Sequence, residues 1–203
     1  MSGLDTLIAK SLELVVRDNL GQITFERIEK RLFEKYVISF SQAVEDFEKL
    51  DTVLREFFGG DADGVEKNLL DKIVAMREQK NHVKQWMTLE DARLMRMMLK
   101  SLGDEDKKNI INTVMGESKT ISDILEISNI PQTSGYRKIN SLIRDGVLLP
   151  HDHVNTSDGK KVTKYKAIFE NVRISVEKNK IVMKILPTRE SIDKSRIMQI
   201  MCS

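Results

Sequence analysis

The sequence predicts a mainly α-helical protein with a small β component, of the α+β class. Apolar residues recur at helical spacing through residues 4–80, which is the pattern of amphipathic helices. Residues 104–145 hold three more helical patterns, separated by Gly116 and Pro131. After Gly146, two pairs of apolar stretches flank turn residues, as in β-hairpins. We therefore expect an N-terminal helical domain and a C-terminal domain of helices and strands with an additional β-hairpin.

Composition and charge narrow the class of protein. The chain has 203 residues, of which 40% are hydrophobic and 32% charged, as in an ordinary soluble globular protein. It has one cysteine, no secretory leader and no apolar run long enough to cross a bilayer, so we expect a cytoplasmic protein with no internal disulfide and no membrane partner. Residues 1–80 hold 12 basic against 16 acidic side chains, a net −4, and residues 104–203 hold 17 against 13, a net +4.

Residues 1–80 are expected to form a helical sensing or interaction domain. Two amphipathic stripes open it, separated by residues 19–21. The stripes consist of Leu4, Leu7, Ile8, Leu12, Val15 and Val16, and of Phe25, Ile28, Leu32 and Phe33. A segment opened near Ser41, and the apolar positions of residues 50–58 and 65–74, predict two or three further helices.

The stretch FFGGDADGVE, residues 57–66, has the glycines and carboxylates of a phosphate or calcium loop. It lacks the Lys-Ser/Thr pair of a P-loop and the carboxylate spacing of an EF-hand. We therefore interpret it as a connector in which Gly59, Gly60 and Gly64 break the helices.

Residues 81–103 are predicted to form a connecting helix. The polar stretch of residues 76–87 is expected to continue a helix, and Thr88 with Asp91 suggests a capping pair that opens the next one. Leu94, Met95, Met98 and Leu99 would form its apolar face up to Gly103. The main interpretation is a core helix that braces the following domain, and the alternative is a dimer helix.

Three helices are predicted between residues 104 and 145. Asp104 is a candidate N-cap of the first, which ends near Gly116. Thr120 and Asp123 form a capping-box pattern for the second, whose apolar face is expected to hold Ile121, Ile124, Leu125 and Ile127. Pro131 ends that helix, because it lacks a backbone N–H, and lies near the start of the third, which covers residues 132–145.

The third helix should present polar side chains outward, because Ile139, Leu142 and Ile143 form its apolar side. It ends at Gly146, which favours the left-handed conformation. The strands that follow, residues 147–149 and 162–169, flank a turn at residues 155–159 with nearby lysines. This order of elements, two helices, a sharp turn, a third helix and a basic pair of strands, is that of a winged helix-turn-helix. We place this domain, together with a second hairpin, at residues 104–186.

In this arrangement the N-terminal end of the third helix enters the DNA major groove, and the basic hairpin grips phosphates. The residues predicted to read base edges are Gln132, Thr133, Ser134, Arg137 and Asn140. The residues predicted mainly to contact phosphates are Tyr136, Lys138, Arg144, Lys160, Lys161 and Lys164.

The string ISDILEISNIPQTSGYRKINSLIRDGVLLP, followed by DGKKVTKYKAIF, resembles the archaeal winged helix-turn-helix regulators usually called ArsR-like. The resemblance covers about sixty residues and rests on the proline turn, Tyr136 with Arg137, the helix end at residues 142–146 and the DGKK wing. It implies that the third helix is the recognition helix and that Arg137 contacts DNA. The thiolate metal-binding motif of metal-sensing members is absent, since the only cysteine is Cys202.

Residues 18–73, from DNLGQITF to LLDKI, resemble a small helical module of archaeal signalling and regulatory proteins. The resemblance implies interaction or sensing rather than catalysis. The last residues, 187–203, form a tail with apolar residues at near-helical spacing, expected to pack on its own chain rather than on a second protomer.

No catalytic, cofactor or metal site is predicted. His82 stands apart from His151 and His153, which would share one side of a strand; solvated histidines are favoured there over a metal site. No arrangement of nucleophile and base supports an enzyme. The protein is therefore predicted to be a sequence-specific, DNA-binding transcriptional regulator whose partner is double-stranded DNA. It could bind DNA as a homodimer, and a signalling protein is the candidate partner of its N-terminal domain. The alternative is an adaptor whose winged helix docks on protein.

Overall fold

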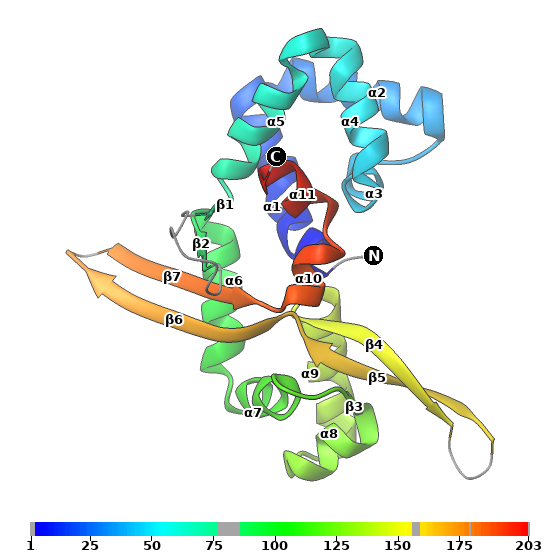
Figure 1. The fold of residues 1–203 in the computed structure, drawn as a ribbon, viewed down its shortest axis with the longest axis vertical. Helices are drawn as coiled ribbons and strands as arrows, with labels where there is room; N and C mark the ends of the chain where they lie inside the picture. The colour runs from blue at the N-terminus through cyan, green and yellow to red at the C-terminus, as the bar shows by residue number, and fades with distance from the viewer. Residues whose placement is uncertain (1–2, 77–85, 156–158, 179, 203) are drawn as a thin grey trace.

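A computed structural model of the protein describes residues 3–76, 86–155, 159–178 and 180–202. It confirms the mixed α and β fold in which helices predominate. The molecule is elongated, with the N-terminal helices at one end, a second group of helices at the other, and two β-hairpins that project to opposite sides between them (Figure 1). Among the described residues no helix combines the length and the apolar character needed to span a membrane.

The N-terminal half is helical, as predicted. Its helices are α1 (Gly3–Leu20), α2 (Gln22–Tyr36), α3 (Phe40–Glu45), α4 (Phe47–Phe58), the 3-10 turn η1 (Gly59–Asp61) and α5 (Ala62–Asp71). Ser39 opens α3 with a capping box to Gln42. Gly59 and Gly60 separate α4 from α5, but the prediction that Gly64 breaks a helix was wrong, because it lies inside α5. The buried Leu69 and Leu70 hold that helix in place and offset the cost of a helical glycine, about 1 kcal/mol.

The predicted connecting helix is shorter than expected. Residues 77–85, and with them the expected domain boundary at residue 80, lie outside the described residues. On either side are strands β1 (Val74–Met76) and β2 (Met87–Leu89). Thr88 therefore does not cap a helix, since it pairs with Lys184 in a sheet. Asp91 alone opens α6 (Ala92–Gly103), accepting hydrogen bonds from the backbone N–H of Arg93 at 3.0 Å and of Leu94 at 2.8 Å.

The second hairpin predicted from the sequence is confirmed and joins these strands. Strands β6 (Phe169–Glu177) and β7 (Lys180–Pro187) pair along their whole length, and the antiparallel sheet has the order β1-β2-β7-β6. Phe169 therefore begins β6 rather than ending the preceding strand. This sheet ties β1 and β2 to the C-terminal region of the chain.

The three helices and two strands predicted between residues 104 and 169 are present with small shifts. They are α7 (Glu105–Val114), α8 (Ile121–Ile127), α9 (Gln132–Arg144), β4 (Leu148–Asn155) and β5 (Lys161–Ala167). A short strand that was not predicted, β3 (Lys119–Thr120), joins them in the sheet order β3-β5-β4. Asp104 caps α7, and Thr120 and Asp123 form the expected capping box. Gly146 has a φ of 74° at the end of α9. Pro131 is the N-cap of α9 and so stands just outside the helix.

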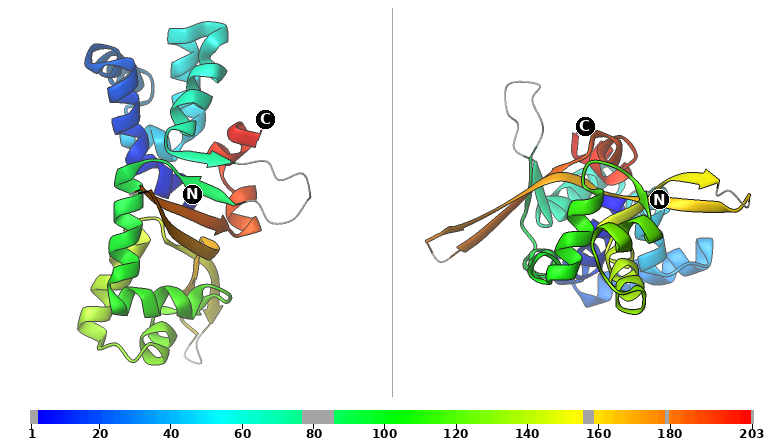
Figure 2. Two further views of the ribbon diagram at one scale, coloured as in Figure 1. Left: turned by 90° about the vertical axis from the view of Figure 1, so that its left-hand side faces the viewer. Right: turned by 90° about the horizontal axis from the view of Figure 1, so that it is seen from below.

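The C-terminal tail packs on its own chain, as expected. It forms α10 (Arg189–Asp193) and α11 (Arg196–Cys202), which lie against α1 and α5 (Figure 2). Ile197 and Met198 are fully buried, and Ser195 Oγ donates a hydrogen bond of 2.5 Å to Asp5 Oδ1. One hydrophobic core therefore includes residues from both ends of the chain.

Candidate nucleic-acid interface

Helix α9 has a buried face and an exposed face. Gly135, Ile139 and Leu142 point inward and are buried. The exposed face carries Thr133, Arg137, Asn140 and Arg144, whose spacing of i, i+4, i+7 and i+11 aligns them on one side of a helix. Within the described part of the chain, none of these four side chains forms a hydrogen bond or ion pair. The exposed face is therefore a row of polar groups with unused donors and two positive charges.

The turn before α9 is formed by local chemistry. Asn129 takes the left-handed conformation with a φ of 53°, and the buried Ile130 anchors the turn to the core. The Ser134 hydroxyl donates a hydrogen bond of 3.1 Å to the Pro131 carbonyl. Gln132 and Thr133 are exposed beside it. Ser134 therefore helps to set the start of the helix, while the other two side chains project from it.

Gly135 allows α8 and α9 to approach closely. A Cβ at this position would lie 2.1 Å from Leu125 Cδ2 and 3.2 Å from Ile130 Cγ2, and the first distance is far inside van der Waals contact. Leu125 is itself buried. The glycine thus fixes the spacing between the two helices and, through it, the direction in which the exposed face of α9 points.

Lys138 stands apart from the other predicted residues. Its ammonium lies 2.6 Å from Asp104 and 2.9 Å from Asp106 at the start of α7. The hydrogen bond from Lys138 lowers the pKa of the Asp104 carboxyl, and the same contact raises the pKa of Lys138. Lys138 therefore joins α9 to α7 and does not lie on the exposed row. Its partners Asp104 and Asp106 are 34 and 32 residues away in the sequence, so no local pattern signals this role.

Ile127 differs from its predicted position. The sequence pattern placed it on the inward side of the second helix, but it is 58% exposed, because α8 ends at this residue and the chain turns away. Tyr136 on α9 is 43% exposed. Ile127 and Tyr136 are thus both accessible at the surface, and for Ile127 the sequence pattern had predicted the opposite.

The hairpin predicted as the wing projects from the lower part of the molecule (Figure 1). Lys161 lies on the same face of β5 as the buried Ala167, and Lys164 lies on the opposite face, because side chains alternate along a strand. Lys160 is exposed just before the strand. Residues 156–158, including the aspartate of the DGKK pattern, lie outside the described residues. The lysines are therefore distributed over both faces of the hairpin rather than gathered in one cluster.

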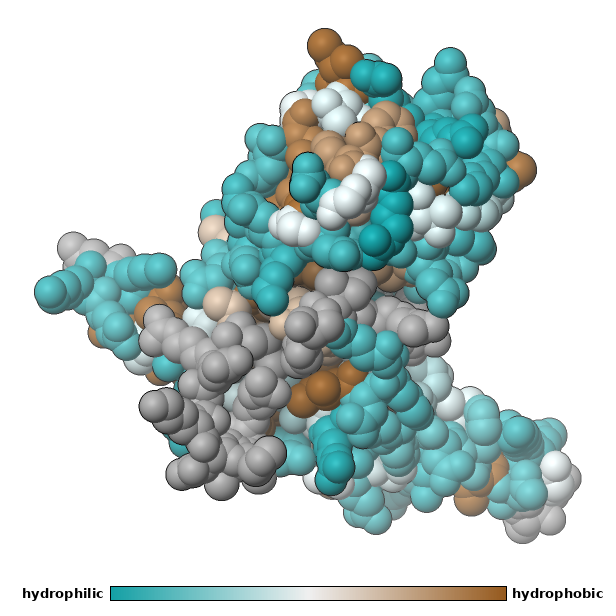
Figure 3. Space-filling model, turned by 45° about the horizontal axis from the view of Figure 1, so that its top comes forward, coloured by the Kyte–Doolittle hydropathy of each residue, from teal (hydrophilic) through white to brown (hydrophobic). Residues whose placement is uncertain are grey.

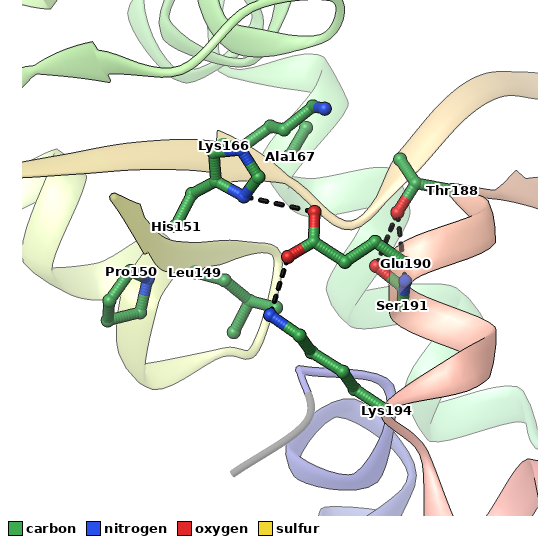
Figure 4. Close-up of a pocket in the computed structure, with 9 residues that line it drawn as sticks. All are labelled: Leu149, Pro150, His151, Lys166, Ala167, Thr188, Glu190, Ser191 and Lys194. Carbon is green, nitrogen blue, oxygen red and sulfur yellow. Dashed lines mark hydrogen bonds and ion pairs between the residues drawn. The ribbon is translucent and has the colours of Figure 1, made fainter. Parts of the chain in front are cut away.

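The two strand histidines contact different partners. His151 Nδ1 lies 3.0 Å from Glu190 Oε2, and Glu190 also binds Lys194 at 2.6 Å (Figure 4). Lys194, followed by His151, lowers the pKa of Glu190. His153 Nδ1 lies 3.3 Å from the Thr163 hydroxyl. The pairing shifts between Pro150 and Asp152, so the two rings are not held toward one ligand. His82 lies outside the described residues.

The pocket beside His151 is small. It is lined by residues of β4 and β5 and by residues in and around α10 (Figure 4), and its cavity volume is about 50 Å³. The contacts of Glu190 with His151 and Lys194 join the predicted wing to the C-terminal tail.

Three acidic residues gather at the α4–α5 connector, in an arrangement that could in principle hold a metal ion. Asp51, Asp63 and Glu66 bring carboxylate oxygens within 4.8 Å of one another. Arg55 forms ion pairs with Asp51 at 2.8 Å and with Asp63. Glu66 is buried, and desolvation, followed by its contact with Asp51, raises its pKa to about 8. Since Arg55 already pairs with two of these carboxylates, the cluster is a structural charge network that supports the connector interpretation.

The comparisons with known proteins add no relative to this picture: the chain matches no family model, no curated protein and no solved structure.

Proposed function

We propose that residues 104–167 form a winged helix-turn-helix that binds double-stranded DNA, and that the chain is a sequence-specific transcriptional regulator of the cytoplasm. The observation that carries the proposal is the row Thr133, Arg137, Asn140 and Arg144, exposed along one side of α9 with no partner among the described residues. Elsewhere many charged side chains are paired, as Lys138 is with Asp104 and Asp106. An unpaired row of donors on a rigid helix is suited to an anionic polymer.

The mechanism assigns the two ends of this row different roles. The N-terminal end of α9, with Gln132, Thr133 and Arg137, would lie in the major groove, where arginine binds guanine O6 and N7 and polar side chains bind other base edges. Asn140 would reach an adjacent base. Arg144 and the wing lysines would contact the flanking phosphates, whose neutralisation gives salt-dependent affinity.

Arg137→Ala tests this function. Purified wild-type protein is first mixed with fragmented genomic DNA near physiological salt, and the retained fragments are sequenced to find a recurrent motif. Loss of one bidentate base contact costs about 1–3 kcal/mol, so we expect Arg137→Ala to lower affinity for the motif roughly 5- to 150-fold. Discrimination at one base position should fall as well.

Arg189→Ala is the matched control, because Arg189 is 96% exposed on α10, outside the proposed interface. It should bind the motif as the wild type does. If the wild type retains DNA without any recurrent motif, or retains none, the adaptor function replaces the proposal, with the winged domain docking on a protein partner.

The N-terminal domain is proposed to bind a signalling partner. Three large apolar side chains on or just after α2 are strongly exposed, namely Ile23, Phe33 and Val37 at 76, 62 and 74%. Exposed apolar groups in a folded domain are characteristic of docking surfaces when they gather in one place. Phe33 and Val37 line the same shallow groove beside the start of α3.

A further inference from the structure

The β6–β7 hairpin has one apolar face and one polar face. Directly paired residues of antiparallel strands lie on the same face, so the register places Val172, Ile174 and Val176 beside Ile185, Met183 and Ile181. The same face continues through Met87 and Leu89 of β2. The other face of β6 carries Asn171, Arg173, Ser175 and Glu177. Such regular alternation is the pattern of a strand with one side covered.

The rest of the chain covers only part of this apolar face. At the base of the hairpin, Met183 and Ile185 are fully buried. Ile174, which pairs with Met183, is 47% exposed, and Val176 and Ile181, nearer the tip, are 75 and 39% exposed. The hairpin extends away from the body of the molecule (Figure 2), and hydrophobic side chains are visible on this arm among hydrophilic ones (Figure 3). The apolar face thus runs beyond the point where its own chain covers it.

Strand β6 also has a free edge. It is the last strand in the order β1-β2-β7-β6, so among the described strands its outer side has no partner. Exposed edges with β-favouring residues pair readily with another strand. A second copy of β6 can pair with this edge in the antiparallel direction about a two-fold axis. The outward-pointing backbone groups of the two copies must then face each other. This is possible only when the axis lies midway between one residue and the same residue of the second copy, and each register is named below by that residue.

The charges of β6 select one register. An axis at Arg173 or Glu177 would place like charges directly opposite, which is destabilising. Within residues 171–177, only an axis at Ser175 places opposite charges across from each other, Arg173 against Glu177 of the second copy, twice. The same register sets Ile174 against Val176 of the second copy, also twice, so the apolar face continues across the axis. Arg173 is already held on the polar face by stacking over Trp86, 4.3 Å from the ring centre.

We propose that two copies of this chain dimerise by antiparallel pairing of their β6 strands about Ser175, which joins the two sheets into one and continues the exposed apolar face. The occupant of this edge is a second copy because the strand complements itself in both charge and hydrophobicity. The pairing goes beyond the proposed function and does not depend on it, since the oligomeric state is measured without DNA.

The first test is the mass of the full chain in solution by sedimentation over a micromolar concentration series. The wild type is expected to be dimeric, and Val176→Lys should raise the dimer dissociation constant roughly tenfold or more. Val176 is 75% exposed, so this change should leave the folded monomer intact, which circular dichroism checks. Ile127→Lys on α8 is the matched control, because Ile127 is 58% exposed and lies outside β6, and it should stay dimeric. A monomeric wild type, or a dimer that Ile127→Lys breaks and Val176→Lys does not, overturns the proposal.

The second test fixes the register by disulfide formation in a Cys202→Ala background. Ser175→Cys places two thiols directly opposite on the axis, at a Cα separation of about 4.5–5.5 Å that suits a disulfide. Rapid oxidation to a covalent dimer is expected. Glu177→Cys is the control, because residue 177 would face residue 173 of the second copy, and its cross-linking should be much slower. Equal rates for both variants would rule out the proposed register.

DNA binding separates this inference from the proposed function. If Val176→Lys is a monomer that still binds a half-site, both proposals stand. If the wild type is a dimer of this form that binds no DNA, only the function fails.

Discussion

At the scale of single residues, local capping chemistry was predictable and long-range charge partners were not. The Asp104 carboxylate accepts a hydrogen bond of 3.0 Å from the backbone N–H of Lys107, as its position before a helix predicts. The ion pair of Lys138 with the same carboxylate joins segments that the sequence separates. Glu66 is a stronger case, since the stretch FFGGDADGVE suggested only a helix connector and gave no sign that the Glu66 side chain is buried.

Glu66 should make the stability of the N-terminal half depend on pH. Its folded pKa is about 8 against an ordinary value of 4.5, so the folded protein holds a proton that the unfolded chain releases between these values. The resulting stabilisation is complete below pH 4.5 and is lost as the pH rises through 8. We expect Glu66→Gln, which cannot ionise, to be about 1–3 kcal/mol more stable than the wild type above pH 8.

Urea unfolding at a series of pH values measures this difference. Asp71→Asn is the control, because Asp71 is exposed at the end of α5 and lies outside the cluster around Glu66, so its loss should leave the pH dependence of stability as it is in the wild type. A constant gap between the wild type and Glu66→Gln at all pH values would show that Glu66 does not titrate in this range.

At the scale of elements, hydrophobic periodicity located most helices, and errors arose where a strand or a helix end interrupted the pattern. Thr88 and Asp91 resemble a capping pair, yet Thr88 lies in β2 between β1 and β7. Pairing on both sides of a three-residue strand is a tertiary effect, because each partner strand comes from another part of the chain. Ile127 likewise fits the apolar side of α8 by spacing but lies at its exposed end.

The packing of α8 on α9 should be sensitive to one methyl group. Gly135→Ala would place a Cβ 2.1 Å from Leu125 Cδ2, so the buried leucine must move or the helices must separate. Overpacking of this kind costs about 1–3 kcal/mol. We expect that loss in the free energy of unfolding, measured in urea, together with weaker DNA binding if the exposed row of α9 turns.

Gly103→Ala is the matched control for this change. A Cβ at Gly103, the last residue of α6, meets nothing within 4 Å, so the variant should be as stable as the wild type or slightly more so. Equal stability of the two alanine variants would mean that the α8–α9 contact is looser than described.

At the scale of the whole molecule, the two ends of the chain close on each other. The Asp5 carboxylate accepts hydrogen bonds from Ser195 Oγ at 2.5 Å and from the Ile197 backbone N–H at 3.4 Å. The sheet β1-β2-β7-β6 makes a second link between the halves. The segments predicted as separate units, residues 1–80 and 187–203, therefore share one core in the structure.

Ile197→Ala should destabilise the protein well beyond the tail. Ile197 is fully buried, and an isoleucine-to-alanine change in a core costs about 2–5 kcal/mol. We expect one cooperative urea transition in both proteins, with its midpoint lowered in the variant. Gln199→Ala on the exposed side of α11 is the comparison and should have a small effect. Two separate transitions, of which only one moved, would show that the halves unfold independently.

The sequence by itself determined most of the helices, the two hairpins, the caps at Asp104 and Thr120 and the polar row on α9. These features follow from periodicity and from contacts within a few residues, which are present in the chain before it folds. The tertiary structure alone decided the burial of Glu66, the pairing of Lys138 with α7, and the unpaired edge and partly exposed apolar face of β6. Each of these depends on which distant segment arrives as a neighbour, and burial and charge pairing are properties of that arrangement rather than of spacing along the chain.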